Sequence, residues 1–146
     1  METSAKTFKE LTVSELYDLL HLRSKVFIVE QDCVYPDVDG KDRKALHIIG
    51  KKEKKIIAYA RCFKAGDYLY EASIGRVVVE ESQRKFNHGH EIMNASIEAI
   101  KAHFNTETIF LSAQCYLTGF YETHGFKHTG KEFLEDGIPH ILMIKK

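Results

Sequence analysis

Residues 74–90 combine the side chains and the spacing of an anion-binding site. An apolar run is followed by a polar loop that contains Arg84 and Lys85, and a helical stripe then begins. Backbone N–H groups at the start of a helix lack partners within the helix and lie at the positive end of its dipole, so they readily bind phosphate groups. Gly89 allows a close approach to the backbone, and Asn87 tolerates a left-handed conformation. These residues fit either a pyrophosphate site or a plain strand–loop–helix connection.

A second candidate group follows the short apolar run at residues 109–113. Gln114 ends that run, and Phe120 and Tyr121 lie about one turn before Gly125, which is placed to end a short helix. By its pattern alone, Tyr121 is typical of a half-buried core aromatic residue. The pattern by itself therefore assigns Tyr121 no chemistry.

The hydrophobic pattern predicts the elements that position these residues. Thr12 and Glu15 form a capping box in front of leucines at helical spacing, and the polar segment 31–44 is predicted to be a loop. Three successive strands favour an antiparallel meander, with a charged hairpin turn at 51–55, and a strand–helix–strand crossover follows it. The predicted strands are residues 7–11, 46–51, 56–63, 74–80, 109–113, 126–134 and 140–144, and the main helical stripes cover 12–27, 92–104 and 117–124.

The composition limits the class of protein. A chain of 146 residues suits one domain, 1–146, with a core of its own. Lys plus Arg total 21 and Asp plus Glu total 21, so a nucleic-acid-binding module is disfavoured, because such modules need a net positive surface. No apolar run approaches the roughly 18 residues of a membrane span. Cys33, Cys62 and Cys115 are odd in number and widely spaced, which indicates reduced thiols in a cytoplasmic protein and no metal site.

Both candidate segments resemble signatures of one enzyme family. The motif Arg84-x-x-Asn87-x-Gly89 resembles the acyl-coenzyme A loop, Arg/Gln-x-x-Gly-x-Gly/Ala, of the GNAT N-acetyltransferases. The motif Phe120-Tyr121-x-x-x-Gly125-Phe126 resembles their second signature, Leu/Phe-Tyr-x-x-x-Gly-Phe. The resemblance is closest to the ElaA-like branch and runs from about Phe8 to Ile144. Segments that carry it include Leu22-Arg23-x-x-Val26-Phe27, Val29-Glu30-Gln31, Tyr35-x-Asp37-x-Asp39-Gly40-x-Asp42, Ile74-Gly75-Arg76-Val77, Ala113-Gln114 and Glu135-Asp136-Gly137-Ile138-Pro139-His140.

The resemblance implies a fold and a reaction. The fold is α+β (mixed α/β): a mostly antiparallel, twisted sheet of six to seven strands with a splayed central parallel pair, flanked by about four helices. The reaction is direct transfer of an acetyl group from acetyl-CoA, as co-substrate, to an unidentified primary amine, a small molecule or a peptide, within a ternary complex. No metal, nucleic acid or membrane is expected to take part, and a homodimer is possible by analogy with this fold.

The resemblance also implies where acetyl-CoA binds. Its pyrophosphate is expected on the backbone amides of residues 86–90, and its pantetheine arm is expected to pair with the strand at 77–79 like an added strand. The expected coenzyme-binding residues are Val77, Val78, Val79, Arg84, Lys85, Phe86, Asn87, His88, Gly89, His90, Gln114 and Phe120.

Catalytic roles follow from the same resemblance. A primary amine with a pKa of about 10.4 is almost fully protonated near neutral pH, so a base is needed. Glu30, Asp136 and His140 lie in acceptor-side segments and are alternative bases, with structural roles for Glu30 and His140 left open. Tyr121 is the family's usual acid. Because the ordinary pKa of tyrosine, about 10, exceeds that of a thiol, about 8.5, hydrogen bonding to the departing thiolate is the expected role.

Two departures leave alternatives open. Lys85 and Asn87 stand where the family's loop has glycines, so the chain could instead be a weakly catalytic acyl-CoA-binding or interaction module with the same fold.

Arg23 and Arg76 lie in apolar stripes and should either pair with carboxylates or hold an acidic acceptor. The acidic residues at 37–42 do not match a calcium loop, and we expect them to form a turn or to attract a cationic acceptor.

Overall fold

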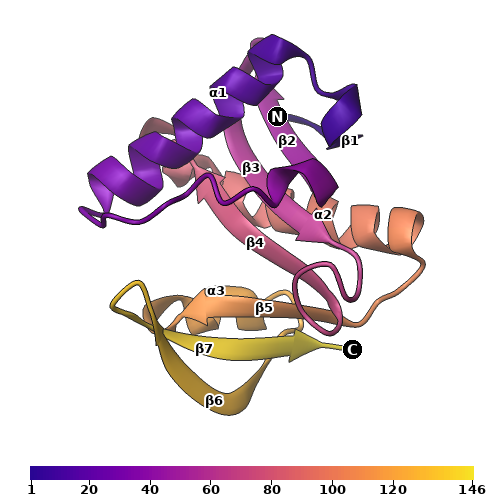
Figure 1. Cartoon of the computed structure of the whole chain (residues 1–146), viewed down its shortest axis with the longest axis vertical. Helices are drawn as coiled ribbons and strands as arrows, with labels where there is room; N and C mark the ends of the chain where they lie inside the picture. The colour runs from indigo at the N-terminus through magenta and orange to yellow at the C-terminus, as the bar shows by residue number, and fades with distance from the viewer.

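A twisted seven-stranded sheet runs through the middle of the molecule, and the computed structural model describes all 146 residues of it (Figure 1). The strand order is β1-β2-β3-β4-β5-β7-β6, with all neighbours antiparallel except β4 and β5. The α+β class, the meander and the central crossover predicted above are confirmed. The strands are β1 (Glu2–Thr7), β2 (Leu46–Lys52), β3 (Lys55–Phe63), β4 (Ala72–Val79), β5 (Ile109–Gln114), β6 (Lys127–Glu135) and β7 (Ile138–Lys145).

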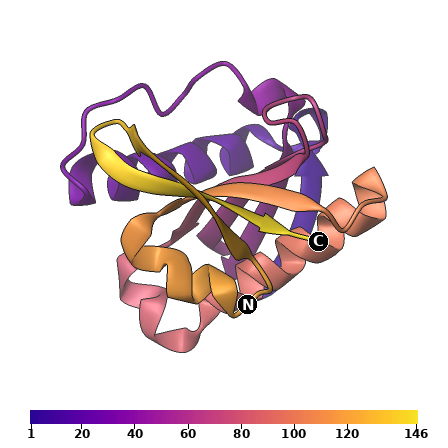
Figure 2. The same ribbon diagram turned by 90° about the horizontal axis from the view of Figure 1, so that it is seen from below.

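Helices cover both faces of the sheet (Figure 2). Helix α1 (Val13–Arg23) continues as a π-helix, η2 (Ser24–Glu30), on one face, and α2 (His88–Phe104) and α3 (Thr118–Glu122) lie on the other. Short 3₁₀ turns complete the chain: η1 (Phe8–Glu10), η3 (Asp42–Lys44), η4 (Glu81–Phe86) and η5 (Cys115–Leu117). None of the helices is long and apolar enough to cross a membrane.

Two apolar clusters hold these layers together. The larger cluster lies between the sheet and α2 and includes Ile92, Met93 and Ile100, which are fully buried. The smaller cluster lies under α1, where Leu19 packs with Tyr59 of β3. The Thr12 hydroxyl accepts a hydrogen bond from the N–H of Glu15, and the Glu15 carboxylate accepts one from the N–H of Thr12, so the predicted capping box starts α1.

Two predicted boundaries were wrong. Residues 7–11 were predicted to be a strand, but β1 ends at Thr7 and a 3₁₀ turn follows. The Glu10 carboxylate accepts a hydrogen bond from the N–H of Thr7, and this local bond turns the chain before a strand continues. Helix α2 begins at His88, four residues before the apolar stripe that marked it, because its first turn is mostly polar.

The central parallel pair separates after a short contact. Strands β4 and β5 pair only through Ala72 with Ile109 and Ser73 with Phe110, and they then diverge (Figure 1). Strand β4 also contains a bulge, because one extra residue lies between the positions that pair with Tyr59 and Arg61 of β3. Each of the two central strands therefore has a stretch of backbone without a partner on the side that faces the other.

The loop at residues 31–44, called the strap below, crosses the α1 face of the sheet (Figure 2). Arg23 of α1 is fully buried, with Nε 2.9 Å from Asp37 Oδ2 and Nη1 2.7 Å from Asp42 Oδ1. Arg61 of β3 is 1% exposed, and its Nη1 lies 3.0 Å from the same Asp42 oxygen. A buried guanidinium needs such partners, so these contacts fix the strap on the sheet.

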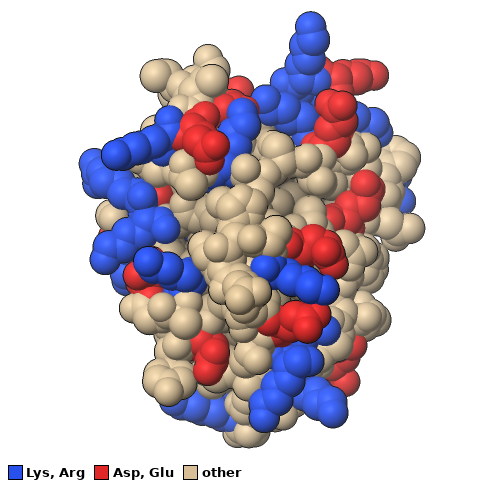
Figure 3. All heavy atoms as spheres, turned by 90° about the vertical axis from the view of Figure 1, so that its right-hand side faces the viewer, with Lys and Arg blue, Asp and Glu red and all other residues tan.

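Two further ion pairs complete this strap network. Arg61 holds both carboxylate oxygens of Asp39 at 2.9 Å, and Arg76 Nε lies 2.8 Å from Asp37 Oδ1. The expectation that buried arginines pair with carboxylates is confirmed. Asp37, Asp39 and Asp42 are all paired with arginines, so their charges are already matched within the protein and are not free to attract a cationic acceptor. Elsewhere, charges of both signs are interspersed over the face shown in Figure 3.

The substitution Asp42→Asn should destabilise the protein by about 3–5 kcal/mol at pH 7, since it leaves two buried guanidinium groups short of a charge partner. Burial by itself would raise the pKa of Asp42, but hydrogen bonds from Arg23 and Arg61 outweigh it and hold the pKa below its usual range. The ion pairs therefore contribute fully above the ordinary aspartate pKa of about 3.9 and lose their contribution as the pH falls below it.

Urea unfolding of the wild type and the variant between pH 7 and pH 3 measures both effects. The stability gap should be widest at pH 7 and should narrow below about pH 4. Asp18→Asn, at an exposed position of α1, is the control and should stay within about 0.5 kcal/mol of the wild type. A stability gap below about 1 kcal/mol for Asp42→Asn would contradict the proposed importance of the strap network.

Candidate active site

A cleft opens where β4 and β5 separate. Its walls come from five parts of the chain: η2, β4, β5 with the helices that follow it, the strap, and the hairpin of β6 and β7. The lining residues are Phe27, Gln31, Cys33, Tyr35, Ile74, Gly75, Arg76, Val77, Leu111, Ser112, Gln114, Leu117, Tyr121, Glu135, Asp136, Ile138 and His140. The structure thus brings Val77, Gln114, Tyr121 and His140, which the sequence marked as candidates, to one cleft.

Tyr121 lies in α3, on the wall of the cleft that faces α2. Its side chain packs edge-on against the rings of Phe120 and Phe126, and the residue is only 8% exposed. Burial raises the pKa of Tyr121 to about 12, and the nearby phenol of Tyr116 adds to the rise. The Tyr121 hydroxyl therefore keeps its proton throughout the neutral range and can act there as a hydrogen-bond donor.

His140 lies on β7 at the opposite wall of the cleft and is 7% exposed. Its Nδ1 is 2.7 Å from the carbonyl oxygen of Ile138, so the hydrogen bond assigns the proton of the neutral imidazole to Nδ1. The lone pair then belongs to Nε2, which lies 3.2 Å from Glu135 Oε2. An imidazole held in this way can accept a proton at Nε2, and the neighbouring carboxylate stabilises the cation that results.

The start of α2 has the backbone geometry of an anion site. Asn87 precedes the helix with φ 60° and ψ 20°, and no side chain caps the first turn. Asparagine tolerates this left-handed conformation better than most residues, which explains how it can stand where the family's loop has glycine. A Cβ atom at Gly89 would lie 3.4 Å from the ring of Phe120, so α2 and α3 approach closely at this glycine.

Histidines surround this helix start. The rings of His90 and His124 both pack against Phe120, and His90 Nδ1 lies 2.9 Å from His124 Nε2. Burial lowers the pKa of His124, and the neighbouring His90 lowers it further. His88 Nδ1 is 2.7 Å from the carboxylate of Glu91. Phe120 therefore packs both against the start of α2, where the candidate phosphate site lies, and against Tyr121, its neighbour in the sequence.

The loop before α2 contains the basic residues Arg84 and Lys85, and both side chains contact other residues of the protein. Arg84 forms a two-pronged ion pair with Glu30, at 2.6 and 2.9 Å, and donates from Nε to the carbonyl oxygen of Val79. Lys85 lies beside the ring of Phe86. Glu30 is thus placed against the coenzyme loop and is not among the residues that line the cleft.

Val78, another candidate for coenzyme binding, can contribute only its backbone. The side chain of Val78 is buried under α1, so only the backbone at this position is free to contact a ligand. The sequence did not single out Arg61, Tyr35 or Glu135. The signal for Arg61 is a charged residue within the apolar run of β3, whereas Tyr35 and Glu135 become visible only when the strap and the hairpin meet. No group of three His, Cys, Asp or Glu side chains is arranged to hold a metal ion.

The chain is similar over nearly its whole length to ElaA and to a solved acyl-CoA N-acyltransferase. Protein ElaA of Escherichia coli (strain K12) is 42% identical over 139 residues, which cover 94% of this chain and 91% of ElaA. The crystal structure of Escherichia coli ElaA has a TM-score of 0.91 at 40% identity and covers 99% of each chain. The crystal structure of an acyl-CoA N-acyltransferase from Pseudomonas aeruginosa has a TM-score of 0.92 at 34% identity and covers 100% of each chain.

More distant structures share the fold. A crystal structure of an aminoglycoside 6'-N-acetyltransferase complexed with coenzyme A has a TM-score of 0.73 at 16% identity and covers 99% of this chain and 96% of that one. Residues 11–146 of the present chain match the family model described as the acetyltransferase (GNAT) domain. The splayed sheet, the uncapped helix start and the cleft between them agree with that match, and the chain belongs to the GNAT acetyltransferase family, with ElaA among its relatives.

Proposed function

We propose that this protein transfers an acetyl group from acetyl-CoA to a primary amine by direct attack within a ternary complex. The observation that carries the proposal is the cleft between β4 and β5, which contains Tyr121 and lies beside an uncapped helix start. The relatives named as acyl-CoA N-acyltransferase and as a coenzyme A complex support the same donor. The three free cysteines support the expected reducing, cytoplasmic setting.

Acetyl-CoA can bind to two stretches of backbone whose hydrogen-bonding groups lack partners within the protein. The pyrophosphate can accept hydrogen bonds from the first amides of α2, near His88 and Gly89, where the helix dipole also favours negative charge. The amide groups of the pantetheine arm can pair with β4 at residues 77–79, on the side where β5 has moved away. A backbone N–H of the same strand can polarise the thioester carbonyl.

The chemistry then needs one base and one donor. The neutral amine nitrogen attacks the thioester carbon, a C–N bond forms, and the C–S bond breaks as the thiolate leaves. We assign the amine proton to Nε2 of His140, because this imidazole lines the cleft and its other nitrogen is fixed by a carbonyl group. Tyr121 donates a hydrogen bond to the developing thiolate. Its pKa of about 12 favours this bond over full proton transfer.

The alternative function is an acyl-CoA-binding module with little turnover. One observation favours it: Arg84, which the family pattern assigns to the coenzyme, is engaged by Glu30. Coenzyme binding has to compete with this exposed ion pair, which is worth about 1 kcal/mol or less. Such a cost weakens acetyl-CoA binding by a small factor and leaves the cleft and its catalytic groups intact.

The substitution Gly89→Trp should reduce the affinity for acetyl-CoA by at least about tenfold, because an indole at this position fills the space between the first turn of α2 and Phe120. Isothermal titration of the purified protein with acetyl-CoA and with free CoA measures this loss. Gly130→Asn is the control, since this exposed glycine of β6 has a positive φ that asparagine tolerates and open space around it. Equal affinity in wild type and Gly89→Trp would place the coenzyme elsewhere.

The substitution Tyr121→Phe should lower kcat by about 10²-fold, because it removes only the hydroxyl that faces the leaving thiolate. The dissociation constant for acetyl-CoA should change less than threefold. Thiol release during turnover gives kcat, and titration gives the affinity. Tyr116→Phe provides the comparison, since this neighbouring phenol is 74% exposed and should keep the wild-type rate. If Tyr121→Phe retained full kcat, the proposed donor role would be ruled out.

The substitution His140→Gln should lower kcat/KM for the amine by about 10²-fold and change the pH dependence of kcat/KM, because it removes the proposed base. Glu30→Gln should cause a smaller loss and should chiefly alter acetyl-CoA affinity, because its carboxylate contacts Arg84. The pH dependence of kcat/KM for the wild type and both variants decides between the two bases. The opposite ranking would assign the base to Glu30.

A further inference from the structure

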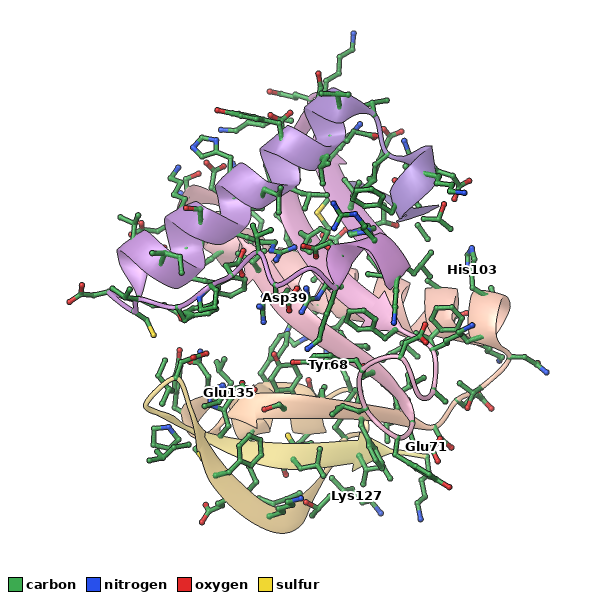
Figure 4. The ribbon with its side chains drawn as sticks, in the orientation of Figure 1. Asp39, Tyr68, Glu71, His103, Lys127 and Glu135 are labelled. Atoms are coloured by element: carbon green, nitrogen blue, oxygen red, sulfur yellow. The ribbon has the colours of Figure 1, made fainter.

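The strap and the β6–β7 hairpin meet above one end of the cleft. The Cys33 thiol lies 3.6 Å from the carbonyl oxygen of Asp136, which joins the strap to the tip of the hairpin. Figure 4 shows Asp39 on the strap side and Glu135 on the hairpin side of the opening between the two halves of the sheet. Helices α2 and α3, with the proposed coenzyme site, lie on the opposite face (Figure 2). The strap end of the cleft therefore lies on the face of the sheet away from the proposed coenzyme site.

This strap end, lined by Tyr35, Arg76, Glu135, Asp136 and His140, has an excess of negative charge. Arg76 is the only lysine or arginine that lines the cleft, and Asp37 already matches its charge at 2.8 Å. Burial raises the pKa of Tyr35 to about 12, so its phenol is neutral. Asp136 forms no ion pair with a lysine, arginine or histidine, and Glu135 approaches only His140.

His140 provides a second and independent indication of a ligand. The residue is 7% exposed, and with Nδ1 committed to the carbonyl of Ile138, its Nε2 has a lone pair and no donor. The Glu135 carboxylate oxygen Oε2 lies 3.2 Å from Nε2, so these two atoms attract each other only when an N–H group joins them, either on the protonated imidazole or on a bound ligand. An ammonium group has three such donors.

We propose that this end of the cleft selects an acceptor with two cationic groups, a linear aliphatic diamine or polyamine. One ammonium group hydrogen-bonds to both His140 Nε2 and the Glu135 carboxylate, transfers one proton to Nε2 and reacts, and Asp136 holds the second ammonium group. The strap and the hairpin both line the cleft and touch at Cys33 and Asp136, which favours a slender chain over a branched or globular acceptor. The acetyl transfer itself rests on the proposed function, whereas preferential binding of a dication does not.

The experiment compares 1,5-diaminopentane with 1-aminopentane, which has the same length and one charge fewer. Each amine is titrated into the full-length protein saturated with CoA, and kcat/KM is measured separately with acetyl-CoA. The diamine should bind at least about tenfold more tightly at low ionic strength, and this preference should shrink as salt is added, because the contacts are ionic. Equal binding of the two amines overturns the inference, whether or not either amine is acetylated.

Variants connect this preference to the hairpin. Asp136→Asn should reduce the ratio of diamine to monoamine affinity to within about threefold of unity, and asparagine tolerates the positive φ of 51° at this position. Glu135→Gln is the second variant, should Asp136→Asn fold poorly. Glu132→Gln is the matched control, because this exposed carboxylate lies on the same hairpin and does not line the cleft. A wild-type ratio in both Asp136→Asn and Glu135→Gln would place the selectivity elsewhere and overturn the assignment.

The two possible failures are distinguishable. Diamine-selective binding without turnover of either amine would support the dicationic site and reject the acetyltransferase reaction. Acetylation of both amines with equal kcat/KM and equal affinity would support the reaction and reject the site. Selective acetylation of a lysine in a folded protein, with no preference between the two small amines, would likewise reject the linear diamine.

Discussion

The guanidinium groups of Arg23 and Arg61 are buried and must be matched by negative charge, and much of the molecule is arranged around that requirement. Their partners come from the strap, a segment with no regular strand or long helix of its own. The strap is held by side-chain charges and not by backbone pairing, so it can cross the sheet and still form a wall of the cleft. Arg76 joins the same network from β4, the strand on which the donor is proposed to lie. Strap position and cleft shape are thus set by one group of interactions.

A second constraint is the loss of pairing between β4 and β5. Ordinary sheets satisfy backbone groups by continuing the ladder, whereas here the ladder stops after two residue pairs and a bulge turns β4 away. The unpaired edges are stable only because they face a solvent-filled cleft, where water or a ligand's amides can bond to them. The same departure from regular structure leaves backbone on which the proposed amide-containing donor can pair, and the uncapped start of α2 is the proposed site for its phosphates.

Local rules predicted much of this structure. The capping box at Thr12, the meander and the left-handed Asn87 all follow from neighbouring residues, and they were found where the sequence placed them. The bulge at Arg76, the ion pair of Arg84 with Glu30 and the match of Arg61 with Asp39 depend on residues far apart in the chain, which no local pattern relates. For the same reason, the sequence left open whether the acidic residues 37–42 form a turn or attract a cationic acceptor, whereas Asp37, Asp39 and Asp42 pair with arginines of the sheet and of α1. The motifs predicted a coenzyme loop and singled out Tyr121, whereas the contact between the strap and the hairpin is visible only in the structure.

The strap network also sets an order of assembly. Its contacts join residues that are 14 to 39 positions apart, and two of its three arginines belong to β3 and β4. Arg61 and Arg76 come close together only once β3 and β4 are paired. Only then can the ion pairs with the strap carboxylates offset the entropy lost when the loop closes. We therefore expect the wall at the proposed acceptor end to be completed after the meander has formed. A chain stalled at an earlier stage has a hydrophobic core but no finished substrate pocket, so the appearance of activity during refolding reports the last event and not the first.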